Sequence, residues 1–299
     1  MKAESLKRET VKDFVEYCKR YRADIDSSFL YDEDLEGFEL NPENPTYIIR
    51  NNMGEVGAAA SLIIDDYNRR GKKARFRIFH SSNHNMDSYK ILFQAILPHT
   101  KGLEKIFVFA PKYNQPLNLC IKKLGFTIDR YAFLYLKKGL EISEYDLPEN
   151  FTIRSFRKGA DESRWCEVRN KGFANLQGSE TPITPEMVRE MVSGEGYIEG
   201  GMMFLFHKDR PVGVVMGEDD DYDGVPAMLI NTLAIIPEYQ GRGLGRILLR
   251  AALQFAKGKS YNRAILSVNG ENERAKSLYI QEGFKEVVAF ICYKYDLIE

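Results

Sequence analysis

One segment of the chain reads Asn231-Thr232-Leu233-Ala234-Ile235-Ile236-Pro237-Glu238-Tyr239-Gln240-Gly241-Arg242-Gly243-Leu244-Gly245-Arg246. Its first six residues are mostly apolar, which predicts a buried strand that ends at Pro237. Three glycines lie within the five residues 241–245, and a helical spacing of apolar residues begins at Leu244. The segment therefore predicts a strand, a glycine-rich loop and a helix in direct succession.

Such a loop is suited to binding an anion. Glycines adopt positive φ and let a ligand come close to the backbone. The amides at a helix start point outward at the positive end of the helix dipole, so phosphate is the expected ligand. Arg242 and Arg246 add positive charge. The spacing excludes a nucleotide-triphosphate loop, which ends in Gly-Lys-Ser/Thr, and a dinucleotide site, which needs G-x-G-x-x-G and a later acidic residue.

A second motif lies downstream of the loop. It reads Asn272-Glu273-Arg274-Ala275-Lys276-Ser277-Leu278-Tyr279 and is followed by Gly283-Phe284. Positions 272, 275, 276 and 279 share one face of a helix, because residues three and four apart are neighbours there. Asn272 and Tyr279 can therefore face the same ligand.

Together the two motifs resemble those of the GCN5-related N-acetyltransferases (GNAT). Gln240–Gly245 matches the family pattern Gln/Arg-x-x-Gly-x-Gly/Ala, and Asn272–Phe284 matches Asn-x-x-Ala-x-x-x-Tyr-x-x-x-Gly-Phe. The resemblance covers residues 151–297. It implies an acyl-coenzyme A-dependent N-acyltransferase, here an acetyltransferase with acetyl-CoA as its co-substrate.

The resemblance also implies roles for individual residues. The coenzyme pyrophosphate would bind the loop amides, and the pantetheine arm would lie beside the preceding strand as an added strand. That strand would then have to splay from the next one, Arg263–Asn269. Tyr279 would protonate the leaving thiolate, which needs a proton as the tetrahedral intermediate collapses. The implied cofactor-binding residues are Leu233, Ala234, Ile235, Gln240, Gly241, Arg242, Gly243, Leu244, Gly245, Arg246 and Asn272.

The general base is left open by the resemblance. Relatives often carry a carboxylate shortly before one of the two motifs, but the corresponding positions here are Leu229 and Ser267. Asn231, Ser267 and Asn269 are candidates to hold a water that removes the proton. Glu218, at the end of a neighbouring predicted strand, is another candidate. An acceptor amine with a lowered pKa would need only water to take its proton.

The first half of the chain echoes the second in its order of helices and strands. Asn114 precedes Gly125-Phe126 by eleven positions, as Asn272 precedes Gly283-Phe284. We predict an α/β protein with two tandem GNAT-like domains, residues 1–140 and 150–299. Each is a mixed, largely antiparallel sheet with helices on both faces, and the hydrophilic segment Lys137–Asn150 is the predicted linker.

The first domain departs from the family pattern at the loop. The segment His84-Asn85-Met86-Asp87-Ser88-Tyr89 stands where the glycines are expected, and Ile121 occupies the tyrosine position. Asp87 would repel a pyrophosphate, and the side chains would block its approach. We predict that this domain does not bind the coenzyme and is not catalytic. Its role would be structural, or it would form part of the acceptor pocket.

Composition sets further limits. A length of 299 residues suits two cores of about 150 each. Forty-two basic and forty-three acidic residues give a net charge of −1, which argues against a nucleic-acid or membrane-surface binder. The chain shows no basic-then-apolar leader and no apolar run of ~20 residues, so we expect a cytoplasmic protein. Its four cysteines and four histidines are scattered, which predicts no metal site.

Signals for the acceptor are few. The acidic run Glu218–Asp223 is predicted to include a hairpin turn over residues 219–224, and it would favour a cationic acceptor if it overhangs the pocket. A solvated turn is the alternative. In this family the region that corresponds to Phe173–Gly178 usually shapes the acceptor site, and Glu180 and Tyr197 are candidates to join it.

These observations favour transfer of an acetyl group to a primary amine of a small molecule. One alternative is a protein or peptide N-acetyltransferase that acts on a lysine or an N-terminus. A non-catalytic acyl-CoA sensor or scaffold is another, because the carboxylates expected at positions 229 and 267 are missing. The sequence predicts no oligomeric state.

Overall fold

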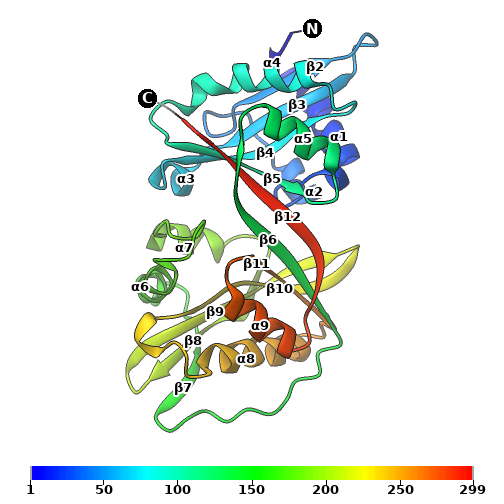
Figure 1. Cartoon of the computed structure of the whole chain (residues 1–299). Helices are drawn as coiled ribbons and strands as arrows, with labels where there is room; N and C mark the ends of the chain where they lie inside the picture. The colour runs from blue at the N-terminus through cyan, green and yellow to red at the C-terminus, as the bar shows by residue number, and fades with distance from the viewer. Residues whose placement is uncertain (1, 298–299) are drawn as a thin grey trace. The chain divides into compact units, whose positions relative to one another are not determined.

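The computed structural model describes residues 2–297 (Figure 1). The chain forms two compact units. Unit 1 comprises the residues up to Ala132 together with those from Val288 onward, and unit 2 comprises Phe133–Val287.

Unit 1 has a mixed sheet with the strand order β1-β2-β3-β4-β5-β12. Its strands pair antiparallel except for β4 and β5, which run parallel. Its elements are β1 (Glu4–Ser5), α1 (Val11–Tyr21), α2 (Asp32–Glu36), β2 (Thr46–Arg50), β3 (Val56–Ile63), α3 (Asp66–Arg70), β4 (Lys73–Ser81), α4 (Met86–Ile96), β5 (Lys105–Pro111), α5 (Gln115–Lys123) and the first part of β6 (Thr127–Lys138).

Unit 2 has the strand order β6-β11-β10-β9-β8-β7. The hairpin-connected strands β8, β9 and β10 and the edge strand β7 are antiparallel, and β10 runs parallel to β11. This confirms the predicted mixed, largely antiparallel sheet. Its elements are β7 (Phe151–Ser155), α6 (Glu162–Phe173), α7 (Pro185–Met191), β8 (Tyr197–His207), β9 (Arg210–Tyr222), β10 (Val225–Ile235), α8 (Leu244–Gly258), β11 (Arg263–Asn269), α9 (Glu273–Gln281) and the start of β12 (Lys285–Asp296).

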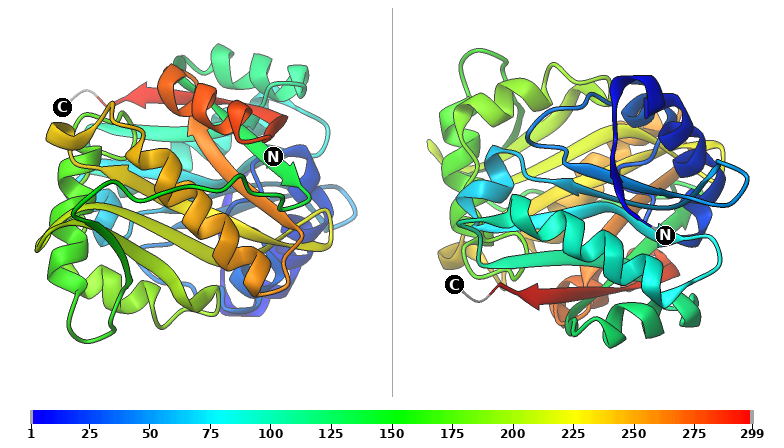
Figure 2. Two further views of the ribbon diagram at one scale, coloured as in Figure 1. Left: turned by 90° about the horizontal axis from the view of Figure 1, so that it is seen from below. Right: turned by 90° about the horizontal axis from the view of Figure 1, so that it is seen from above.

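Helices α6 and α8 cover opposite faces of the unit 2 sheet (Figure 2). A Cβ on Gly213 would lie 3.0 Å from Leu248 of α8, and a Cβ on Gly172 of α6 would lie 2.8 Å from the Cβ of Ala234. Gly213 pairs with Ile235, the neighbour of Ala234, and successive strand residues point to opposite faces. Both faces of β10 are thus packed against a helix, as the sequence predicted.

Each unit contains strand residues from the other half of the sequence. The second part of β6, residues 133–138, belongs to unit 2, where Leu136 packs on Ala227 and Ile265. In unit 1, β12 pairs with β5 through residues 290–296. An alternating sequence specifies which face of a strand is buried, but it does not specify the neighbouring strand. The domain boundaries at residues 140 and 150 stay a prediction.

Two local predictions were wrong. The turn predicted over residues 219–224 is shorter, because β9 continues to Tyr222 and the turn consists of Asp223 and Gly224 alone. Both residues have positive φ, 58° and 67°, which gives a two-residue turn of the type whose twist matches its strands. Lys137 and Lys138 were assigned to the linker but belong to β6. In both cases polar residues continue a strand beyond its apolar part.

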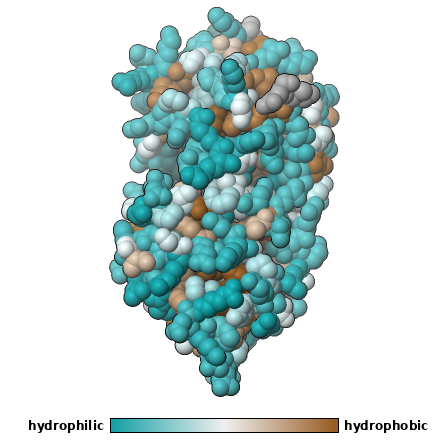
Figure 3. Space-filling model, turned by 90° about the vertical axis from the view of Figure 1, so that its left-hand side faces the viewer, coloured by the Kyte–Doolittle hydropathy of each residue, from teal (hydrophilic) through white to brown (hydrophobic). Residues whose placement is uncertain are grey.

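Residues 2–297 contain no membrane-spanning helix and no metal-ligating cluster. No described helix is long and apolar enough to cross a membrane, and no group of three or more metal-ligating side chains was found among the described residues. The face in Figure 3 is mostly hydrophilic, with apolar atoms in small separate patches. All four cysteines are buried as free thiols.

Leu248 tests the packing of α8 on the sheet of unit 2. Its side chain is fully buried, so Leu248→Ala should lower the free energy of unfolding by about 2–5 kcal/mol through lost burial and a residual cavity. Ile280 is 57% exposed, so Ile280→Ala should change the free energy of unfolding by less than about 0.5 kcal/mol. Denaturant titration of both variants checks this; equal losses would contradict the packing described.

Candidate active site

The loop between β10 and α8 is open where a ligand would approach. Gly241 and Gly243 have φ of 79° and 77°, a region that side chains rarely adopt. A Cβ on Gly243 would meet no atom within 4 Å, and Gly243 is exposed. The positive φ values explain both glycines, and the approach to Gly243 is unobstructed.

The amides of this loop are free to bind a ligand. Gly243 is the N-cap of α8, and no side chain caps the helix. Within residues 2–297, the amides of residues 241–245 have no protein acceptor, whereas the Arg246 amide donates to the Gly243 carbonyl at 3.0 Å. Unpaired amides at the positive end of a 15-residue helix form an anion-binding site.

Polar side chains hold the loop in this form. Gln240 donates through Nε2 to the Ile235 carbonyl at 2.9 Å, which ties the loop to the end of β10. Arg242 donates to the Glu238 carbonyl at 2.9 Å, and its guanidinium lies 5.0 Å from the centre of the Tyr239 ring. Both side chains thus tie the loop to the residues that precede it.

Strand β10 separates from β11 before it reaches the loop. The two strands pair only through Met228 with Ala264 and Leu229 with Ile265. On its other edge, β10 pairs with β9 as far as Ile235. The splay expected from the resemblance is present, and it leaves one backbone edge of β10 open from the end of the pairing to the loop.

Tyr279 lies on α9 with its ring buried. The side chain is 8% exposed and its ring centre lies 5.9 Å from that of Phe284. Burial raises the pKa of Tyr279 to about 12. Within the described residues its hydroxyl has no hydrogen-bond partner, and it is not among the fully enclosed polar atoms. The phenol is therefore protonated at neutral pH and free to donate a hydrogen bond.

Asn272 has a structural role that the sequence motif did not reveal. Its Oδ1 accepts a hydrogen bond from the Ala275 amide at 3.1 Å, so it is the N-cap of α9. Asn114 caps α5 of unit 1 in the same way, through the Leu117 amide at 3.2 Å. The repeated asparagine is thus explained in both units by helix capping.

Of the candidates for proton removal, the structure brings Glu218 and Asn231 together. Asn231 is the extra residue of a β-bulge in β10, and its Nδ2 donates to Glu218 Oε2 on β9. Burial raises the pKa of Glu218; Asn231 opposes this shift, and Asp220 adds to it. Periodicity alone gives no signal for a bulge, so the sequence did not predict this pair.

The other two candidates, Ser267 and Asn269, lie on β11. Asn269, at the end of β11, donates through Nδ2 to the Gln177 carbonyl at 2.6 Å, which fixes part of the loop between α6 and α7. Ser267 is exposed on β11.

Comparison with known proteins finds one family that matches the second half of the chain. The model of the acetyltransferase (GNAT) family matches residues 171–284, a range that includes the loop, the splayed strands and α9. This segment of the chain is similar to the acetyltransferase (GNAT) family.

Relatives of this chain include mycothiol acetyltransferases. The protein from Acidimicrobium ferrooxidans is 31% identical over 191 residues, which are 62% of this chain and 60% of that protein. The protein from Acidothermus cellulolyticus is 26% identical over 208 residues, 65% of this chain and 63% of its own length. The matches thus span less than two thirds of these relatives.

Solved GNAT structures share the fold over nearly the whole chain. A GCN5-related N-acetyltransferase from Sphaerobacter thermophilus superposes with a TM-score of 0.74 at 18% identity and covers 98% of this chain and 95% of its own. A tandem GNAT protein from the clavulanic acid biosynthesis pathway superposes with a TM-score of 0.70 at 12% identity. The match covers 99% of this chain and 98% of that protein. The predicted tandem GNAT fold is confirmed.

Unit 1 keeps the GNAT framework but not the free amides. Its parallel strands β4 and β5 pair only at residues 73–75 and 105–107 and then separate. At the start of α4, however, Asn85 Oδ1 accepts hydrogen bonds from the Asp87 amide at 2.8 Å and the Ser88 amide at 3.4 Å. A side chain of the protein therefore occupies the position that an anion would take.

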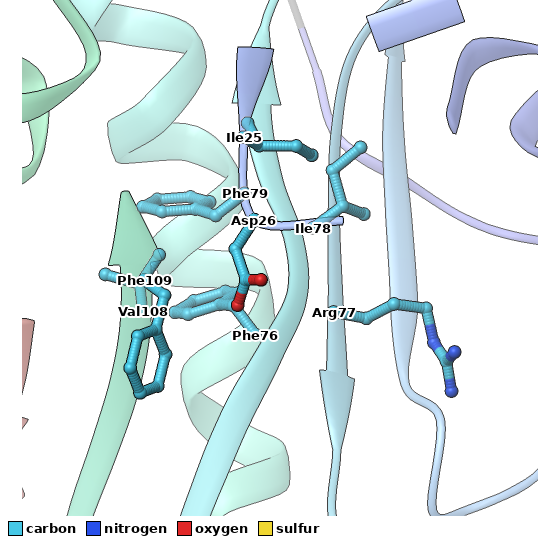
Figure 4. A pocket seen from close by; sticks show the side chains of 8 residues that line it. All are labelled: Ile25, Asp26, Phe76, Arg77, Ile78, Phe79, Val108 and Phe109. Atoms are coloured by element: carbon cyan, nitrogen blue, oxygen red, sulfur yellow. The ribbon is translucent and has the colours of Figure 1, made fainter. Parts of the chain in front are cut away.

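The space between β4 and β5 of unit 1 is largely filled by side chains, which leave only a small pocket. This pocket is lined by Ile25, Asp26, Phe76, Arg77, Ile78, Phe79, Val108 and Phe109. Figure 4 shows the Asp26 carboxylate directed toward Phe76 and the Arg77 side chain directed away from the group. Ile121, at the tyrosine position, is fully buried. Unit 1 thus lacks a phenol at that position and has apolar side chains where unit 2 is open.

Gly243 tests whether the loop binds the coenzyme. We expect Gly243→Asp to abolish acetyl-CoA binding, because it places a negative charge and a side chain where phosphate would sit. Isothermal titration measures the affinity. Two controls separate charge from strain: Gly243→Asn tolerates positive φ without a charge and should retain part of the affinity, and Gly258→Asp, at the other end of α8 with open space around it, should retain all of it.

Proposed function

We propose that this protein transfers the acetyl group of acetyl-CoA to a primary amine of a small molecule. The observation that carries the proposal is the presence of three features together in unit 2. Free amides at the start of α8 are followed by the open edge of β10, and α9 carries a protonated phenol at Tyr279 that is free to donate. Each feature meets one requirement of a thioester-bound coenzyme.

In this proposal the coenzyme binds along the loop and the strand. Its pyrophosphate accepts hydrogen bonds from the free amides of residues 241–245, and its pantetheine arm bonds the backbone of Leu233 and Ile235 on the open edge of β10. Asn272 contributes its side-chain Nδ2, because its Oδ1 is engaged in capping α9. Arg242 and Arg246 supply positive charge near the phosphates.

The reaction then proceeds by addition and elimination. The neutral amine attacks the thioester carbonyl, a carbon–nitrogen bond forms, and a tetrahedral intermediate carries the negative charge on oxygen. When it collapses, the carbon–sulfur bond breaks and the thiolate takes the proton of the Tyr279 hydroxyl. The nitrogen loses its proton to Glu218, directly or through a water held by Asn231. Solvent then restores the protonation states of both residues.

The acceptor class is supported by two observations. The relatives are named mycothiol acetyltransferases, and their acceptor is a small molecule. Along β9, Glu218 and Asp220 are partly buried and carry carboxylates that favour a cationic group. A screen of small amines, peptides and lysine-containing proteins, read by thiol release from acetyl-CoA, tests this. Transfer to peptides alone favours the peptide enzyme, and coenzyme binding without transfer favours a sensor.

Unit 1 is assigned a structural role in this proposal. The Asn85 cap, the largely filled space between β4 and β5, and Ile121 in place of a phenol support the inference that it binds no coenzyme. The expected stoichiometry is one acetyl-CoA per chain.

Tyr279→Phe tests the proton donor. The ring and its packing on Phe284 remain, so coenzyme affinity should not change, whereas kcat should fall about 10²-fold or more because the thiolate leaves unprotonated. Steady-state kinetics and isothermal titration give the two quantities. A variant with wild-type turnover would refute the catalytic role, and a pure sensor would be unaffected by the change.

Glu218→Gln tests the base. A base must be deprotonated, so kcat/KM of the wild type should fall as pH drops through the raised pKa of Glu218. The glutamine variant should turn over more slowly, and its kcat/KM should no longer show the fall that depends on Glu218. The pH dependence that remains should come from the titration of the acceptor amine alone. Profiles from roughly pH 5 to 9 with one acceptor decide the matter. Superimposable profiles would show that water, and not Glu218, takes the proton.

A further inference from the structure

The proposed reaction requires two helices to be held at a fixed separation. The amides that would bind the diphosphate lie at the start of α8, whereas Tyr279 lies on α9. A coenzyme bound at both places spans from one helix to the other. An error of about 1 Å in their relative placement is enough to slow a positioned reaction considerably.

Glu282 is a buried carboxylate between these helices. It directly follows α9, and its side chain is 6% exposed. Arg250 of α8 binds it with two hydrogen bonds, Nε to Oε2 at 2.8 Å and a terminal nitrogen to Oε1 at 2.8 Å. Arg246, in the first turn of α8, places its Nε 3.3 Å from Oε1 and also donates to Gln281. The first two turns of α8 are thus joined to the end of α9.

The backbone at Glu282 is held as firmly as its side chain. Its amide donates to the Tyr279 carbonyl at 3.1 Å, and its carbonyl accepts from Lys137 Nζ of β6 at 2.9 Å. Lys137 is 9% exposed and lies at the negative end of the α9 dipole. Since Tyr279 lies less than one helical turn before Glu282, a shift of Glu282 displaces Tyr279 as well.

We propose that Glu282 is a positioning residue, which sets the distance between the coenzyme loop on α8 and the Tyr279 hydroxyl on α9. Apolar side chains also pack the two helices together, and a bidentate guanidinium–carboxylate pair adds hydrogen bonds of fixed direction to that packing. The inference rests on the proposed function and adds a residue that neither sequence motif specifies.

The charges around Glu282 support this assignment. Arg246 and Arg250 pair with the Glu282 carboxylate, and Lys137 binds the backbone carbonyl of the same residue, so three cations lie around one carboxylate-bearing residue. Part of this positive charge lies in the first turn of α8, where cations are unfavourable unless an anion is bound nearby. Arg246 is 40% exposed, so it can contact Glu282 and a coenzyme phosphate from the same position.

Glu282→Gln in the full chain tests the proposal. Glutamine keeps the shape but cannot accept both guanidinium bonds as a carboxylate does, so kcat should fall about tenfold or more. Acetyl-CoA affinity by isothermal titration should stay within about twofold, because the loop amides remain. The decisive readout is a double-mutant cycle with Tyr279→Phe. If Glu282 acts by placing the hydroxyl, its substitution should not lower kcat further when that hydroxyl is absent.

Two further variants serve as controls. Glu273→Gln removes an exposed carboxylate at the start of α9 that pairs only with Lys276 among the described residues, and it should leave kcat unchanged. If Glu282→Gln does not fold, Arg250→Lys keeps the charge and loses the bidentate geometry, and it should give the same non-additivity with Tyr279→Phe. Circular dichroism establishes the folded fraction of each variant.

The outcomes separate the two proposals. If Glu282→Gln lowers kcat equally in the wild-type chain and in the Tyr279→Phe variant, the positioning role is overturned and the transferase assignment stays in place. A Tyr279→Phe variant with wild-type turnover, or the absence of thiol release with every acceptor, would overturn the proposed function and the positioning role with it.

Discussion

The early end of the pairing between β10 and β11 is the constraint on which unit 2 depends. Two parallel strands normally continue their hydrogen bonds along their common length, because unpaired backbone in a protein interior is unfavourable. Here the ladder stops after Leu229 and Ile265, while β10 continues to Ile235. The donors and acceptors left on that edge need water or a ligand. The loop at the end of the strand then offers its own free amides, so the same path provides sites for an extended arm and for a terminal anion.

Unit 1 shares the splayed strands of unit 2 but differs from it at the start of the following helix. Its strands β4 and β5 diverge after a similarly short pairing, so the splay belongs to the fold and does not depend on coenzyme binding. What differs is the helix start. Asn85 caps α4 with its own side chain, whereas Gly243 leaves α8 uncapped. A single polar side chain at the N-cap satisfies the same amides that an anion would otherwise bind, so capping and anion binding exclude each other at this position.

The sequence predicted most of the fold and the location of the loop, because both depend on local rules. Apolar periodicity gave the helices and strands, and the glycines indicated positive φ, which Gly241 and Gly243 adopt. Three features were beyond its reach for physical reasons. The neighbours of β6 and β12 depend on long-range pairing, the bulge at Asn231 breaks the alternation without a residue signal, and Glu282 has its role only through arginines on another helix. Contacts distant in sequence are not encoded in any local pattern.

The contacts of Glu282 also bear on why charge is buried at this place. Burying a carboxylate with two guanidinium groups is a poor way to gain stability, because desolvation offsets most of the attraction. Its advantage is directional, because each hydrogen bond has a preferred angle and length. A site whose ligand is long and touches two helices needs that restriction more than it needs extra stability. The burial of Glu282 beside a solvent-facing glycine loop is therefore consistent with selection for geometry.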